Sequence, residues 1–280
     1  MTTFGERCRE AIASRGPLCV GIDPHASLLE AWGLPDDAAG LRAFGLRTVA
    51  AAEGNVAFVK PQVSFFERHG STGLAALEEV LAAAREAGLV AIADAKRGDI
   101  GSTMDAYAAA WLTPGAPLEA DALTVSPYLG VGALEGAFSA AESAGKGAFV
   151  LAATSNPEAT SLQAALEGER TVAASVVAAV AERNAAAGDG WGSVGVVIGA
   201  TVDWTAAGLE PFPPAPILAP GFGHQGAVPG DLRTVFGEMA PCVIASESRS
   251  ILASGPGGVA DAITAAAERY RDAAKEGSRG

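Results

Sequence analysis

Short apolar runs alternate along the chain with longer segments in which apolar residues recur at helical spacing. Most runs end at a glycine, proline, serine or charged residue, and they are typical of strands buried on both faces. The segments between them, for example 73–88 and 171–187, are rich in Ala, Leu and Val and predict helices. The predicted strands are Leu18–Ile22, Val56–Val59, Val90–Ala93, Ala122–Val125, Ala148–Ala152, Val194–Ile198, Ile217–Ala219 and Val243–Ala245.

Eight alternating strand and helix units in 280 residues indicate an α/β fold, the (β/α)8 or TIM barrel, with residues 1–280 as a single domain. No linker, charge block or change of composition divides the chain. A doubly wound open sheet is the alternative architecture, because counting strands from one sequence can err by about one or two. The stretch 156–192 is long for one unit, and it predicts an additional helix.

The overall charge and the cysteines exclude several classes of function. A net charge of −13 argues against a general nucleic-acid surface and against an anionic membrane. It still admits a small anionic substrate, because local charge in a pocket outweighs the global sum at short range. Three separated cysteines fit a reducing cytoplasm and offer no metal motif. The chain has no signal-peptide core and no apolar run of membrane-spanning length, so we expect a soluble cytoplasmic protein.

Charged residues follow the second and third predicted strands. Asp94 and Lys96 lie two positions apart, so an extended strand would point both side chains to one face. Asp99 is predicted to be the N-cap of a helix that begins at Ile100. Lys60 follows the second strand, and in a barrel these strand ends converge on one mouth. An ion pair that only stabilises the fold, combined with a helix cap, is the alternative interpretation.

An array of lysines and aspartates is costly to desolvate, so its position in a barrel mouth implies a use. Carboxylates held about 4 Å from a substrate carboxylate repel it by about 1 kcal/mol in water and about 4 kcal/mol at an effective dielectric constant near 20. That repulsion disappears if the substrate loses its carboxylate as CO₂, while the lysines stabilise the carbanion and one donates a proton. The sequence has no dinucleotide fingerprint and no metal-ligand cluster, so it predicts a decarboxylation without metal or cofactor.

The second half of the chain predicts an anion site. Residues 220–230 form a glycine-rich loop after the seventh strand, long enough to close as a lid. Arg249 follows the eighth strand and opens a helix, where barrels frequently hold a phosphate and where arginine can bind it bidentately. The alternative for the glycine-rich loop is a plain connection between elements, and the alternative for Arg249 is a surface salt bridge.

The ordered motifs at these strand ends resemble the orotidine 5′-phosphate decarboxylase family, in its longer bacterial subgroup (type 2). This resemblance implies decarboxylation of orotidine 5′-monophosphate to uridine 5′-monophosphate in de novo pyrimidine biosynthesis, without metal or cofactor. The matching segments are Gly21–Pro24, Lys60–Glu67, Asp94–Thr103, Thr124–Tyr128, Thr154–Pro157, Val197–Thr201, Pro220–Gly226 and Ser248–Leu252.

The resemblance also implies the catalytic residues and a homodimer with shared active sites. Lys60, Asp94 and Lys96 would form the charge array in one subunit, and Asp99 would be donated by the neighbouring subunit. Lys96 would protonate C6 of the pyrimidine, and Asp94 would lie beside the departing carboxylate.

The implied contacts to the nucleotide come from five further residues. Asp23 would bind ribose hydroxyls, as would Thr103 across the dimer interface. Ser126 would contact the pyrimidine. Gln225 would reach from the lid to the base and the phosphate, and Arg249 would hold the phosphate.

Two details depart from the family pattern, Val202–Trp204 after the sixth strand and His224 in the lid. His25, His69 and His224 are interpreted as ordinary loop histidines.

Two other functions stay open. Hexulose-phosphate synthases and ketogulonate-phosphate decarboxylases share the D-x-K-x-x-D core but use magnesium and an enediolate. The second open function is that of a barrel that binds a nucleotide without catalysis. Placing Asp94 beside a substrate carboxylate would not help such a protein to bind its ligand.

Overall fold

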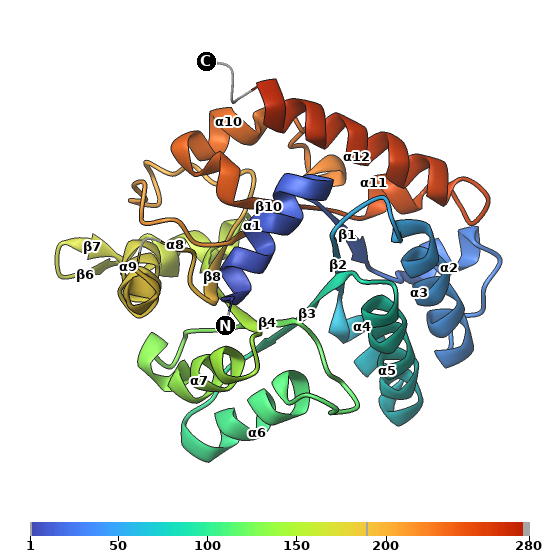
Figure 1. The fold of residues 1–280 in the computed structure, drawn as a ribbon, viewed down its shortest axis with the longest axis horizontal. Coiled ribbons are helices and arrows are strands. Elements are labelled where there is room, and N and C mark those ends of the chain that lie inside the picture. Colours follow the sequence, from blue (N-terminus) through green and yellow to red (C-terminus); the bar gives the residue numbers. More distant parts are fainter. Residues whose placement is uncertain (1, 189, 277–280) are drawn as a thin grey trace.

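The computed structural model describes residues 2–188 and 190–276. Within them eight parallel strands close a barrel in the order β1-β10-β9-β8-β5-β4-β3-β2, and the helices lie around it (Figure 1). The closed barrel confirms the predicted (β/α)8 fold and excludes the doubly wound open sheet. The barrel strands are β1 (Leu18–Ile22), β2 (Phe58–Pro61), β3 (Val90–Arg97), β4 (Ala122–Val125), β5 (Gly147–Ala153), β8 (Val194–Ile198), β9 (Ile217–Pro220) and β10 (Val243–Glu247).

The helices connect these strands and cover the outside of the barrel. The α-helices are α1 (Phe4–Arg15), α2 (Ala26–Ala31), α3 (Ala38–Ala52), α4 (Val63–Glu67), α5 (Gly70–Glu86), α6 (Gly101–Leu112), α7 (Glu135–Ser143), α8 (Thr160–Gln163), α9 (Val172–Asn184), α10 (Asp231–Phe236), α11 (Arg249–Leu252) and α12 (Val259–Glu276). The short 3₁₀ helices are η1 (Val131–Leu134), η2 (Pro157–Ala159), η3 (Ala185–Ala187), η4 (Gly223–Gln225) and η5 (Gly237–Cys242).

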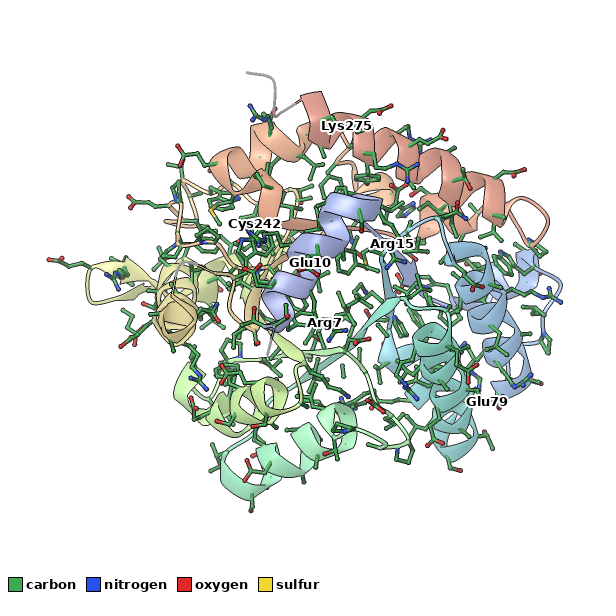
Figure 2. All side chains as sticks on the ribbon, viewed as in Figure 1. Arg7, Glu10, Arg15, Glu79, Cys242 and Lys275 are labelled. Atoms are coloured by element: carbon green, nitrogen blue, oxygen red, sulfur yellow. The ribbon has the colours of Figure 1, made fainter. Side chains whose placement is uncertain are left out.

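Local sequence explains where several helices begin. The side-chain oxygens of Thr3, Asp37 and Thr171 accept hydrogen bonds from backbone N–H groups at the start of α1, α3 and α9. Such caps satisfy donors that the first helical turn leaves without partners. Side chains from strands and helices fill the space between them (Figure 2), and each residue of β1, β2, β4, β8 and β10 is buried.

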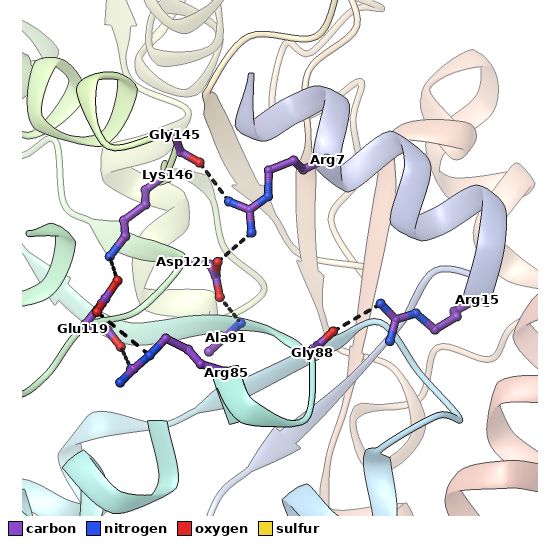
Figure 3. Close-up of polar contacts among 9 residues, drawn as sticks. All are labelled: Arg7, Arg15, Arg85, Gly88, Ala91, Glu119, Asp121, Gly145 and Lys146. Atoms are coloured by element: carbon purple, nitrogen blue, oxygen red, sulfur yellow. Dashed lines mark hydrogen bonds and ion pairs between the residues drawn. The ribbon is translucent and has the colours of Figure 1, made fainter. Parts of the chain in front are cut away.

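Helix α1 covers the amino-terminal ends of the strands and lies across the middle of the ring in Figure 1. Arg7 donates to Asp121 Oδ1 at 2.7 Å and to the carbonyl of Gly145 at 2.8 Å, just before β4 and β5. Asp121 Oδ2 accepts the N–H of Ala91 at 3.0 Å, and Arg15 reaches the carbonyl of Gly88 (Figure 3). The amino end of the barrel is therefore closed, which leaves the carboxyl end for a site.

Two details of the predicted elements differ in the structure. Strand β2 runs to Pro61, so Lys60 lies within the strand and not after it. The stretch 156–192 contains the expected additional helix, α8, together with a hairpin of β6 (Leu166–Glu167) and β7 (Arg170–Thr171) that was not predicted.

The prediction of Asp99 as an N-cap is wrong. Helix α6 begins at Gly101, and its N-cap is Ile100, which has no side-chain cap. Asp99 Oδ1 accepts the N–H of the next residue, Ile100, at 2.8 Å. Gly101 has a φ of +53°, a value that glycine adopts readily, and this turn delays the start of the helix.

Candidate active site

Three charged side chains meet at the carboxyl end of β2 and β3. Lys60 Nζ lies 2.8 Å from Asp94 Oδ2, and Lys96 Nζ lies 2.5 Å from Asp94 Oδ1. Asp94 thus bridges two ammonium groups. The Lys60 and Asp94 side chains are 6% and 10% exposed, whereas the Lys96 side chain is 46% exposed. The buried pair fixes the array, and Lys96 is its most exposed member.

The backbone of β3 is irregular at this point. Among the described residues, Lys96 is the one non-glycine residue with a positive φ, +50°, and the register between β3 and β4 shifts between Ala93 and Arg97. A left-handed conformation at a non-glycine residue costs about 1–3 kcal/mol and clusters at functional sites. Asp94 and Lys96 meet in one ion-pair network, as the sequence predicts, although the backbone here is not the regular extended strand on which that prediction rested.

Thr124 holds this strained segment, and the sequence interpretation missed it. Its hydroxyl donates to Asp94 Oδ1 at 3.0 Å and accepts the backbone N–H of Lys96 at 2.9 Å. The residue predicted to act at this strand end is Ser126, two positions further along. A polar side chain inside an otherwise apolar buried strand was the available signal, because a buried hydroxyl needs a partner.

The electrostatics keep Asp94 and Lys60 charged. Burial alone would raise the pKa of Asp94, but the charges of Lys60 and Lys96 outweigh it and hold the pKa well below its usual range. Burial would lower the pKa of Lys60, but Asp94 and Asp23 outweigh it, so this pKa lies above its ordinary value. The pair therefore presents fixed charges at neutral pH.

The array forms one wall of a cavity of about 340 Å³ at the carboxyl end of the barrel. Every barrel strand, or the loop that follows it, contributes to the lining. Asp23 Oδ1 and Ser248 Oγ belong to lining residues, are buried and have no hydrogen-bond partner among the residues that the structure describes. Buried polar atoms without partners are uncommon in folded proteins, so these two oxygens retain unused hydrogen-bonding capacity beside the cavity.

The opposite side of the cavity is formed by the glycine-rich loop and the start of α11. Gln225 and His224, both in η4, line it together with Arg249, the first residue of α11. This meets the expectation that Gln225 and Arg249 share one site. His224, interpreted from the sequence as an ordinary loop histidine, lines the cavity as well, while His25 and His69 are not among the lining residues.

Three predicted site residues are not brought to the cavity within this chain. Asp99, Thr103 and Ser126 are absent from its lining. Thr103 is exposed on α6. Ser126 instead packs against Gly98, where an added Cβ would lie 2.6 Å from the Ser126 carbonyl oxygen.

Other lining residues were not singled out from the sequence. Gln62 donates weakly to the Asp94 carbonyl at 3.4 Å, and Thr154, Ser155 and Asn156 line the cavity from the loop after β5. Each belongs to a motif quoted above, but spacing alone assigns no role to a polar residue in a loop.

No group of at least three His, Cys, Asp or Glu in 2–188 and 190–276 is arranged to hold a metal ion. In the same part of the chain, no helix has both the length and the apolar character needed to cross a membrane.

A closed parallel barrel with a charged cavity at its carboxyl end defines the class of protein, a (β/α)8-barrel enzyme. The chain belongs to the orotidine 5′-phosphate decarboxylase / HUMPS family, whose model matches residues 16–266.

Individual relatives agree with this family. The orotidine 5′-phosphate decarboxylase of Salinispora arenicola is 52% identical over 270 residues, which covers 96% of each chain. A crystal structure from Streptomyces avermitilis, provisionally named as the same enzyme, has a TM-score of 0.93 and 49% identity and covers 98% of this chain and 97% of its own. The OMP decarboxylase of Leishmania donovani has a TM-score of 0.75 and 30% identity, covering 97% of this chain and all of its own (100%).

Proposed function

We propose that this protein decarboxylates orotidine 5′-monophosphate to uridine 5′-monophosphate in pyrimidine biosynthesis, and that it does so without metal or cofactor. The observation that carries the proposal is the position of Asp94 between Lys60 and Lys96 in the cavity. The chain is also about half identical to relatives named orotidine 5′-phosphate decarboxylase.

The charge array suits loss of a carboxylate. Asp94 stays ionised because Lys60 and Lys96 lower its pKa, so a substrate carboxylate beside it is repelled until it leaves as CO₂. The two lysines stabilise the negative charge left on C6. Lys96, the more exposed of the two, donates the proton to C6, and Asp94 keeps its ammonium group oriented.

The rest of the cavity suits the nucleotide. Asp23, with a buried unpartnered oxygen, accepts from ribose hydroxyls. Arg249 binds the phosphate, for which a guanidinium is suited by its bidentate geometry. Gln225 contacts the phosphate and the base from the lid.

We propose further that the active unit is a homodimer whose partner subunit supplies Asp99 and Thr103, since neither residue lines the cavity of its own chain. Ile100 and Tyr128 are large apolar residues in the adjacent loops and are 63% and 77% exposed. A partner subunit seated here would cover them. Ser126 joins the two loops that carry these residues, because it packs on Gly98.

The single-domain organisation of residues 1–280 and a cytoplasmic location are part of the same proposal. Cys8, Cys19 and Cys242 are free and buried, which is compatible with a reducing compartment.

The direct test measures the loss of orotidine 5′-monophosphate absorbance on adding the purified protein, with and without a chelator. We expect turnover that the chelator leaves unchanged. Turnover abolished by the chelator would favour the magnesium-dependent relatives that form an enediolate, and nucleotide binding without any turnover would favour a non-catalytic barrel.

Variants separate the roles of Lys96 and Asp99. Lys96→Ala is expected to abolish turnover while uridine 5′-monophosphate still binds, as measured by calorimetry. Substantial residual turnover would contradict its role as proton donor. Equal mixing of Lys96→Ala and Asp99→Ala subunits is expected to restore about a quarter of the wild-type activity, because half of the dimers would carry one intact site. No recovery after verified subunit exchange would contradict the shared site.

A further inference from the structure

Glu247 is a buried carboxylate that the proposed reaction does not use. It ends β10, is 6% exposed and precedes Arg249 by two residues. Its oxygens accept hydrogen bonds from Ser250 Oγ at 2.7 Å and from Tyr270 Oη at 2.8 Å. Among the described residues it forms no ion pair within 4.0 Å. A buried carboxylate held by hydroxyl groups alone is costly, so its position calls for a structural reason.

Tyr270 connects this carboxylate to the lid. It lies in α12, is fully buried at 0% exposure, and its ring packs edge-on against Phe222 with the centroids 5.6 Å apart. Phe222 lines the cavity directly before η4. Burial, followed by the charge of Glu247, raises the pKa of Tyr270, so its hydroxyl remains a donor throughout the neutral range.

Ser250 connects the same carboxylate to the arginine. It is the second residue of α11 and follows Arg249 directly. Its hydrogen bond to Glu247 therefore fixes the first turn of this short helix, from which the guanidinium reaches the cavity.

Gly223 brings the lid onto the same two side chains. It has a φ of +70°, and a Cβ at this position would lie 2.1 Å from Ser250 Oγ and 2.8 Å from Glu247 Oε1. A side chain there would displace either the lid or the hydrogen bond. The base of the lid is thus packed against the Glu247–Ser250 contact.

We infer that Glu247, Ser250 and Tyr270 form a clamp that sets the separation between Arg249 and the lid, and so positions both for the phosphate of the substrate. These are positioning residues, because they act through Arg249, Phe222 and Gly223. The inference rests on the proposed function in that the bound anion is the nucleotide phosphate. It predicts an effect confined to the phosphate half of the ligand.

The test compares ligands that differ by that phosphate. Affinities for uridine 5′-monophosphate and uridine are measured by calorimetry for the wild-type protein, Tyr270→Phe and Ser250→Ala. Each variant removes one hydroxyl that donates to Glu247. We expect each to weaken nucleotide binding about tenfold, because Arg249 and the lid would be less well positioned for the phosphate, and to leave uridine affinity within about twofold.

The matched control is Ser254→Ala. Ser254 lies just beyond the same helix, and its hydroxyl donates only to the backbone carbonyl of Ile251, at 2.6 Å among the described contacts. We expect it to change neither affinity. Thermal unfolding of each variant, with and without nucleotide, verifies that the binding data refer to folded protein. If Tyr270→Phe does not fold, Ser250→Ala carries the test.

The outcomes separate the clamp from the reaction. Equal loss of affinity for both ligands, or no loss for either, overturns the clamp. Wild-type protein that fails to decarboxylate orotidine 5′-monophosphate overturns the proposed function, whatever the ratio of the two affinities.

Discussion

Replacing Asp94 with asparagine tests whether the array is a set of fixed, buried charges. The substitution keeps the size of the side chain but removes the charge that lies 2.8 Å from Lys60 Nζ. At an effective dielectric constant of 20 this attraction amounts to about 6 kcal/mol. Lys60 limits the loss by releasing its proton, which costs about 5 kcal/mol at pH 7 from a reference pKa near 10.4. We therefore expect Asp94→Asn to lower the free energy of unfolding by about 3–5 kcal/mol at pH 7.

The pH dependence gives the sharper signature. In the wild-type protein the folded-state pKa of Lys60 is raised, so its contribution is complete below the unfolded pKa and is lost only as the pH rises through the folded value. In Asp94→Asn we expect the folded-state pKa of Lys60 to fall below the unfolded value, because burial then outweighs the remaining attraction of Asp23. The free energy of unfolding of the variant should therefore increase by up to about 1.4 kcal/mol per pH unit between pH 7 and 10. The difference in this free energy between wild type and variant should narrow over the same range.

Urea unfolding at several pH values, at one fixed protein concentration, measures this gap. Asp121→Asn is the matched control. Its partner Arg7 is 38% exposed, and a guanidinium does not release its proton. Asparagine keeps only one acceptor oxygen for Arg7 and the N–H of Ala91, so we expect a loss of about 1–3 kcal/mol that does not vary between pH 7 and 10. A gap for Asp94→Asn below about 1 kcal/mol at pH 7, or one that stays constant to pH 10, would refute the reasoning.

Two further substitutions address the support of the site and the closed end of the barrel. Thr124→Val removes the hydroxyl that bonds Asp94 and the Lys96 backbone. We expect kcat to fall about tenfold and the free energy of unfolding to fall by about 1–3 kcal/mol, whereas Thr124→Ser should keep both at wild-type values in the same assays. A fully active valine variant would contradict the role of this hydroxyl. Gly147→Ala adds a Cβ 2.1 Å from the Phe4 ring. Urea unfolding should show that overpacking lowers the free energy of unfolding by about 1–3 kcal/mol, while KM stays unchanged because neither residue lines the cavity. A changed KM would show that the amino and carboxyl ends of the barrel are not independent.

The sequence was sufficient for the strands because their signal is local. Each apolar run is buried in the closed barrel, and periodicity encodes that burial directly. Boundaries were less accurate where backbone geometry decided them. The glycine conformation at residue 101 delays helix α6, and the charged end of β3 continues through Lys96 to Arg97.

The charged part of the site could be predicted from the sequence, because a charged residue at a buried strand end needs a partner of opposite charge. Lys60, Asp94 and Lys96 meet as expected. Thr124 and His224 were missed because a hydroxyl or an imidazole in a sequence acquires a role only from what the fold brings within reach. Asp99, Thr103 and Ser126 do not line the cavity of a single chain. The roles proposed for Asp99 and Thr103 require a second subunit, and residue spacing does not encode where such a subunit would lie.

The closure of the barrel by α1 has a consequence for how this protein can change. The residues of α1 lie apart from the cavity lining, and the contacts of Arg7 and Arg15 tie together the loops that precede several strands. Thermal stability and substrate specificity therefore depend on opposite ends of the barrel. Substitutions at the amino end could raise heat tolerance while others at the carboxyl end alter specificity, with little effect of one set on the other.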